Sequence, residues 1–169
     1  MESVWKEAVE KQFGAAIDTL EAAIVACPDD LWGDGTKEPP FWYLVSHTLF
    51  WLDYYLSESR EGFAPPAPFG LEEFDPAGVM PPRVYTKAEL LEYLEYDRRK
   101  FNELAAGLNE ETERRRFKSY WMDFTRAEIL LYNLRHVQHG GAQLNLILRQ
   151  QTNSAPRWVR WVNDKPEQR

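Results

Sequence analysis

The stretch TRAEILLYNLRHVQHGGAQLNLILRQ, residues 125–150, decides the fold of this chain. Its apolar residues recur at steps of three and four, which predicts one long amphipathic helix. Thr125 and Glu128 have the spacing of a capping box, which marks the start of that helix, and Thr86 and Glu89 have the same spacing at the start of another expected helix. The helix carries two of the three histidines in the chain, His136 and His139.

Three other segments have helical periodicity, so the sequence predicts an all-α protein, a four-helix bundle in a single domain over residues 1–169. A length of 169 residues is typical of one domain, and 44% hydrophobic residues can supply a core. The expected helices span about residues 2–27, 40–58, 86–107 and 125–151.

The expected second and third helices are joined by an unusually long connection. Residues 59–84 hold six of the eleven prolines in the chain. A connection of this length is uncommon inside a compact domain. It is either a lid or a Pro-rich crossover that lets the second and third helices run parallel, and we favour the crossover.

The C-terminal tail, residues 152–169, is too apolar to be free in solvent. Trp158 and Trp161 would expose large rings there. We therefore expect the tail to pack on the bundle or against a partner, and we expect the protein to be a homodimer.

Composition excludes several classes of function. The formal net charge of -7 argues against nucleic acid binding, which needs clustered cationic side chains. The one basic run, residues 114–118, is expected to be a solvated loop. The chain has no apolar run long enough to cross a membrane and no secretion signal at its start, so a cytoplasmic protein is expected. Cys27 is the only cysteine, which excludes an internal disulfide.

The histidines lie in strongly apolar surroundings. His47 belongs to the segment FWYLVSHTLFWLDYYL, residues 41–56, which is apolar almost all round. At about 100° per residue, His136 shares a stripe with Ile129 and Ile147 and faces the core, and His139 lies about 60° away. Each histidine is either an ordinary hydrogen-bonded residue or part of a metal site, because bundle cores often hold metals between facing helices.

Two blocks carry a resemblance to a known family. The segments WYLVSHTLFWLDYYL, residues 42–56, and LRHVQHGGAQLNLILRQ, residues 134–150, resemble the DinB/YfiT-like superfamily. The resemblance implies a four-helix bundle of unusual connectivity, often a homodimer. It also implies a divalent transition metal, such as Zn, Ni or Fe, held by three histidines. Some members are thiol-dependent transferases or isomerases that use low-molecular-weight thiols.

Carried over by position, the resemblance makes His47 and His136 metal ligands. The third ligand would stand at residue 140, which is a glycine here, with His139 beside it. Either His139 turns inward to complete the site, or the site is degraded and binds metal weakly or not at all.

Two functions follow from these alternatives. The first is a DinB-like metal-binding protein, a metal-dependent hydrolase or a thiol-dependent transferase, with metal ligands His47, His136 and His139. The second is a metal-free bundle that binds a small apolar ligand or serves as a dimerising structural protein. No residue stands out as a catalytic nucleophile, and Cys27 is not expected to be one.

Overall fold

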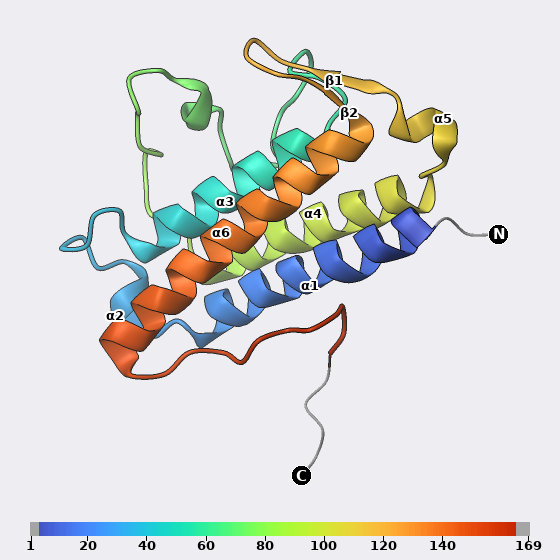
Figure 1. Ribbon diagram of the computed structural model, residues 1–169. Helices are drawn as coiled ribbons and strands as arrows, with labels where there is room; N and C mark the ends of the chain where they lie inside the picture. Colours follow the sequence, from blue (N-terminus) through green and yellow to red (C-terminus); the bar gives the residue numbers. More distant parts are fainter. Residues whose placement is uncertain (1–3, 165–169) are drawn as a thin grey trace.

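The computed structural model describes residues 4–164, and most of them are helical (Figure 1). The predicted all-α character is thus confirmed, with one small sheet added. Four helices are long: α1 (Val4–Ala26), α3 (Phe41–Leu56), α4 (Lys87–Ala106) and α6 (Arg126–Thr152). The smaller elements are α2 (Asp29–Trp32), a 3-10 turn (Glu72–Phe74), α5 (Glu110–Glu113), β1 (Arg116–Lys118) and β2 (Asp123–Thr125).

Both predicted capping boxes are present and fix where two of the long helices begin. The Thr86 hydroxyl accepts a hydrogen bond from the Glu89 backbone N–H at 3.2 Å, and the Glu89 carboxylate accepts one from the Thr86 N–H at 2.8 Å. Thr125 and Glu128 repeat the arrangement at the start of α6. Such pairs satisfy backbone N–H groups that have no partner inside the helix.

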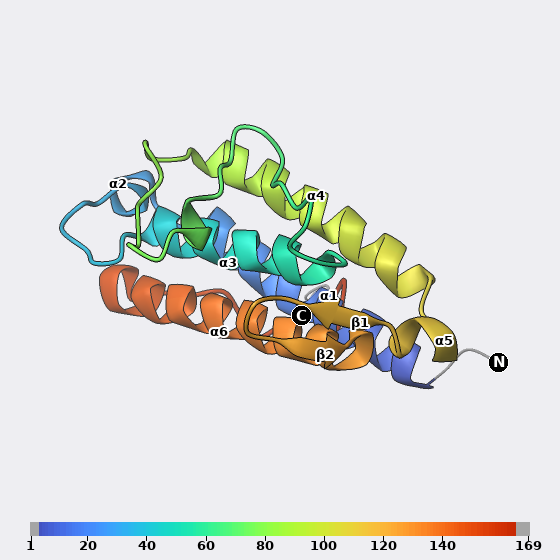
Figure 2. The same ribbon diagram turned by 90° about the horizontal axis from the view of Figure 1, so that it is seen from above.

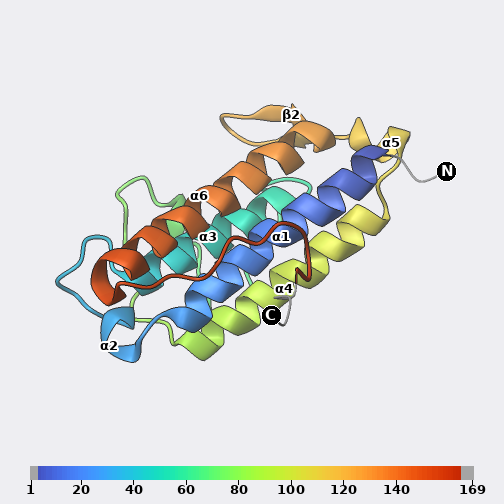
Figure 3. The same ribbon diagram turned by 60° about the horizontal axis from the view of Figure 1, so that its bottom comes forward.

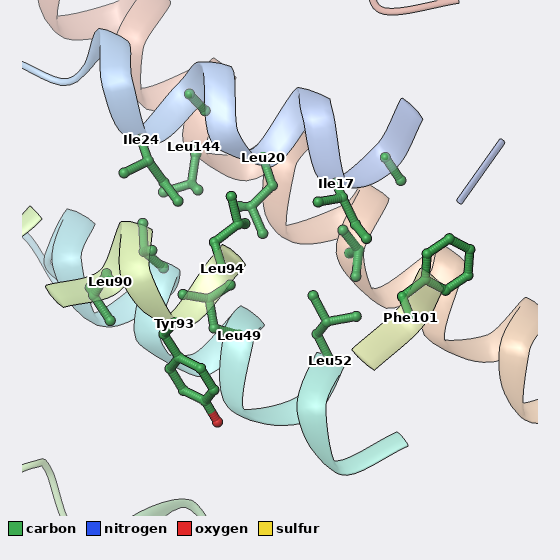
Figure 4. Packing of buried hydrophobic residues seen from close by; sticks show 14 of the residues in the cluster. Ile17, Leu20, Ile24, Leu49, Leu52, Leu90, Tyr93, Leu94, Phe101 and Leu144 are labelled. Atoms are coloured by element: carbon green, nitrogen blue, oxygen red, sulfur yellow. The ribbon is translucent and has the colours of Figure 1, made fainter. Parts of the chain in front are cut away.

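The four long helices enclose one apolar core. Helix α6 packs against α1 and α3, and α4 packs against the same two helices. Every long helix contributes side chains that are almost fully buried, as Figure 4 shows. These include Ile17, Leu20 and Ile24 of α1, Leu49 and Leu52 of α3, Leu90, Leu94 and Phe101 of α4, and Leu144 of α6. Removing this apolar surface from water is the main force that holds the helices together.

The connection between α3 and α4 projects beyond α3 on the side remote from α1 (Figures 1 and 2). It is anchored by aromatic rings, because Phe63 and Phe74 pack edge-on against Tyr54 of α3 at centroid distances of 5.2 and 5.0 Å. Edge-to-face pairs of this kind add to the stabilisation from burial. The connection therefore holds the Glu72–Phe74 turn beside α3.

Residues 110–124 contain structure that periodicity did not predict. Strands β1 and β2 form an antiparallel hairpin in which Phe117 pairs with Phe124. Phe117 is fully buried, and Tyr120 and Trp121 at the tip are exposed. Strands of three residues are too short to show an alternating pattern.

The described part of the C-terminal tail lies along α1, as Figure 3 shows. The Val162 backbone N–H donates to the Lys11 carbonyl at 3.1 Å, and the Val162 side chain fills the space beside Gly14. Through Val162 the described part of the tail packs on α1, with Trp158 and Trp161 partly exposed. The expected helix start at residues 2–3 and the tail end at residues 165–169 lie outside the described residues. None of the helices within residues 4–164 has the length and apolar character needed to cross a membrane.

Candidate functional site

Helices α3 and α6 bring His47 and His136 together. The centroids of the two imidazole rings lie 5.7 Å apart, with the ring planes at 60°. Aromatic rings surround the pair, since His47 lies between Tyr43 and Trp51 on its own helix. The helical periodicity that placed His136 on the core-facing side of its helix thus corresponds to its position in the structure.

Glu73 approaches this pair from the long connection. One of its carboxylate oxygens lies 2.7 Å from Nδ1 of His47 and accepts a second hydrogen bond, at 2.9 Å, from the indole N–H of Trp51. Burial alone would raise the pKa of Glu73, but its bonds to His47 and Trp51 and the nearby Tyr43 hydroxyl together hold that pKa below the usual value. The carboxylate is therefore ionised at neutral pH and fixes the orientation of the His47 ring.

Glu73 is the site residue that sequence reasoning missed. It lies in a Pro-rich segment without periodicity, 26 residues beyond His47. Its only signal is an acidic pair, Glu72 and Glu73, between the apolar residues Leu71 and Phe74. That pattern indicates a polar group near an apolar surface, but it does not identify His47 as the partner of the Glu73 carboxylate.

The His136 ring forms a hydrogen bond with the backbone of α3. Its Nε2 lies 3.2 Å from the carbonyl oxygen of Thr48. A carbonyl oxygen only accepts, so Nε2 carries the proton of the neutral ring and Nδ1 is left as an acceptor. Burial, aided by the neighbouring His47, lowers the pKa of His136 to about 4. At neutral pH this ring is therefore an uncharged imidazole.

His139 lies at the edge of the site. It lines the same cavity as the other two histidines, but the residue is exposed to solvent. Among residues 4–164 it has no hydrogen-bond or ion-pair partner to hold its ring in place. That His139 acts as a third metal ligand remains a prediction.

Gly140 is required by the packing of α6 against α3. A Cβ atom on residue 140 would lie 2.3 Å from Oγ1 and 2.7 Å from Cγ2 of Thr48, closer than real atoms approach. The Thr48 hydroxyl is fixed by donating to the Leu44 carbonyl at 2.7 Å. Gly141 behaves differently, because a Cβ atom there would be 3.5 Å from Thr19 Cγ2, an ordinary contact with α1.

The site has a cavity of about 300 Å³ that lies between α3 and α6. Its walls are formed by Tyr43, Leu44, His47, Thr48, His136, His139, Gly140 and Gln143. They offer imidazole nitrogens, a phenol, a threonine hydroxyl and an amide, but no cysteine thiol. Cys27 lies elsewhere, buried at the end of α1, and burial raises the pKa of its thiol to about 12. The cavity is suited to bind a ligand and to accept protons or hydrogen bonds from it.

Comparison with known protein families yields one match. The model of the DinB superfamily matches residues 12–144, from α1 to the last third of α6. The chain belongs to the DinB superfamily. Comparisons with curated proteins and with solved structures gave no match.

The three-histidine metal set that the DinB resemblance implies does not fit this DinB protein. Two of the implied positions, His47 and His136, are adjacent. The third is Gly140, where a side chain could be added only if Thr48 shifted. Among the residues that the structure describes, no three His, Cys, Asp or Glu side chains are placed to hold a metal ion together.

Proposed function

We propose that this DinB protein binds a small organic ligand without a metal, and that His47, oriented by Glu73, accepts a proton or hydrogen bond from that ligand. The observation that carries the proposal is the contact between Thr48 and Gly140, which fills the position of the third ligand. The close packing there is part of the interface between α3 and α6.

The hydrogen bonds of the two rings support a role as acceptors. Glu73 holds Nδ1 of His47, so the neutral ring keeps its Nε2 lone pair free. His136 donates through Nε2, so its Nδ1 is free. An imidazole held by a carboxylate is the arrangement that general bases use, because the carboxylate fixes the ring and stabilises the imidazolium that forms. A ligand with a hydroxyl, thiol or amine group would match these acceptors.

Binding of a divalent metal by His47 and His136 is the second candidate. The bond from His47 to Glu73 favours it, because metal-ligating histidines usually donate their other ring nitrogen to a carboxylate or carbonyl group. Zn, Ni or Fe would suit imidazole ligands, with His139 or water completing the shell. The hydrolase and thiol-dependent transferase activities expected from the resemblance belong to this candidate.

We further infer that the four long helices form the bundle typical of the family, with residues 57–86 as its crossover. Figure 1 shows α3 and α4 running in the same direction, which supports this interpretation. A connection between parallel helices must return along their length, and the aromatic anchors of Phe63 and Phe74 on α3 are consistent with such a path.

Metal analysis combined with thermal unfolding separates the two candidates. The protein is purified without a His tag, its transition-metal content is measured, and its Tm is recorded with and without EDTA. The metal-free proposal predicts a content far below one equivalent and the same Tm in both conditions. One bound metal per chain that is lost in His136→Ala, together with a large fall of Tm in EDTA, would establish the second candidate instead.

A further inference from the structure

A second cavity adjoins the histidine pocket along the seam between α3 and α6. It has a volume of about 390 Å³, and it shares Leu44 and Gln143 with the histidine pocket. Its other walls come from α2 and the loop after it, from the start of α3 and from the last turns of α6. They are Leu31, Thr36, Lys37, Glu38, Pro39, Phe41, Leu146, Ile147, Gln150 and Gln151. The two cavities therefore lie next to each other, and we call them together the α3–α6 groove.

The middle of the groove is apolar. Leu31 and Phe41 are buried in its floor with exposed fractions of 7% and 1%, and Ile147 is half-buried. Leu146 at its edge is 55% exposed, which is high for a large apolar side chain. A hydrocarbon chain lying here would remove that surface from water, and apolar contact is what most small-molecule sites supply.

Among the described residues, Lys37 is the one permanently charged cation that lines either cavity, and Glu38 beside it is the one carboxylate. The residue is half-buried, and within residues 4–164 its ammonium group has no ion pair or hydrogen bond. Its neighbour Glu38 is exposed. The pKa of Asp34 is lowered by its bonds to Thr36 and, to a smaller extent, by the charge of Lys37. A half-buried cation that makes no direct ion pair with a described residue, next to an apolar groove, is suited to an anionic ligand group.

We propose that the α3–α6 groove binds a medium-chain carboxylate, with the carboxylate at Lys37, the hydrocarbon chain over Leu44 and Leu146, and the far end directed to His47. This assignment names a ligand class for the proposed function and rests on it. The part of this path along α3, from residue 41 at its start to residue 47, covers about 9 Å of the helix axis, and Lys37 lies beyond it in the preceding loop. An extended medium-chain carboxylate is long enough to cover that span.

Calorimetric titration of the full chain with decanoate, below its micellar concentration, tests the assignment. We expect one decanoate per chain, weaker binding of decanol and no binding of butyrate. Lys37→Gln should weaken decanoate binding about fivefold, as expected for the loss of a partly exposed ion pair, and should leave decanol unchanged. Lys118→Gln is the matched control, because Lys118 is exposed on β1, away from the groove.

A second pair of variants tests the apolar wall. Leu146→Ser should weaken decanoate binding several-fold. Leu131→Ser, on the same helix and with a similar exposed fraction of 48%, should not. Equal affinity of wild type and Lys37→Gln, or equal effects of the two leucine substitutions, would overturn the assignment. So would the absence of any binding of decanoate to the wild type.

The hydroxyl-bearing analogue ω-hydroxydecanoate separates this inference from the proposed role of His47. If that role is correct, the added hydroxyl tightens binding in the wild type and gives no gain in His47→Phe. A different result would be decanoate binding that depends on Lys37, with no gain in affinity from the hydroxyl that depends on His47. The assignment of the groove would then hold, and the proposed role of His47 would be wrong.

Discussion

The side chain of Thr48 on α3 occupies the space that a Cβ atom of residue 140 on α6 would need. The hypothetical Cβ would lie 2.3 Å from Oγ1, and that hydroxyl is held by the Leu44 carbonyl. The same residue supplies the carbonyl that receives the His136 Nε2–H. Thr48 thus closes the third ligand position and also orients one of the two remaining histidines.

Alanine substitutions of the two adjacent glycines should have opposite effects. Alanine favours a helix interior over glycine by about 1 kcal/mol. At Gly140 the clash with Thr48 outweighs this gain, and overpacking of about 1–3 kcal/mol leaves Gly140→Ala destabilised. Gly141→Ala, with its ordinary 3.5 Å contact, should be neutral or up to about 1 kcal/mol more stable. Urea unfolding of both variants measures the difference, and a stabilised Gly140→Ala would show that the close contact is absent.

The buried carboxylates between α3 and α4 should make stability depend on pH. Asp53 and Asp97 are both fully buried, and only Asp53 is paired with Lys100. Neither carboxylate oxygen of Asp97 has a hydrogen-bond partner within the described chain. Burial, reinforced by Asp53, raises the pKa of Asp97 well above its ordinary value.

The sign of the effect follows from that raised pKa. The stabilising contribution of protonated Asp97 is fully present below its unfolded pKa of about 4 and is lost as pH rises through the folded pKa. Between these two pKa values, the free energy of unfolding of the wild type should fall by up to about 1.4 kcal/mol per pH unit. Asp97→Asn should not show this fall. Urea unfolding from pH 5 to 9 measures the slope for both proteins. Identical slopes would mean that Asp97 is ionised in the fold.

Glu73 should determine the tautomer of His47. At pH 8, nitrogen NMR of the rings should find the proton of His47 on Nδ1, where Glu73 accepts it, and the proton of His136 on Nε2. Glu73→Ala removes the acceptor and should move the His47 proton to Nε2. His136, whose acceptor is the Thr48 carbonyl, serves as the internal control. An unchanged His47 tautomer in the variant would show that Glu73 does not determine which ring nitrogen carries the proton.

The expected homodimer is testable through the tail. Trp158 and Trp161 remain 68% and 47% exposed although the tail packs on α1. If these rings contact a second copy, light scattering gives about twice the chain mass of 19.9 kDa, and Trp158→Ser with Trp161→Ser restores the monomer. A mass near that of one chain at all concentrations would exclude the dimer.

Local patterns predicted the parts of this fold that depend on neighbouring residues. The capping boxes at Thr86 and Thr125 fixed two helix starts, because both partners are within three positions. Helical periodicity also assigned His136 to the inner face, where its ring lies beside His47. Such features follow from helix geometry alone.

The parts that depend on distant contacts were not predictable in the same way. Glu73 reaches His47 only because aromatic side chains seat the long connection on α3. The hairpin that buries Phe117 beside Tyr54 and Tyr55 has strands too short for a period-two pattern. The sequence showed that Gly140 stands where a ligand was expected. Its contact with Thr48 depends on the distance between two packed helices, and no sequence pattern gives that distance.

A calorimetric zinc titration of the untagged wild type, next to the double variant Thr48→Gly with Gly140→His, tests the central claim most directly. The double variant clears the space beside residue 140 and restores an imidazole there. The account predicts no stoichiometric zinc binding by the wild type and about one zinc per chain in the double variant, given three histidine ligands. One tightly bound zinc per wild-type chain, lost in His136→Ala, would contradict it.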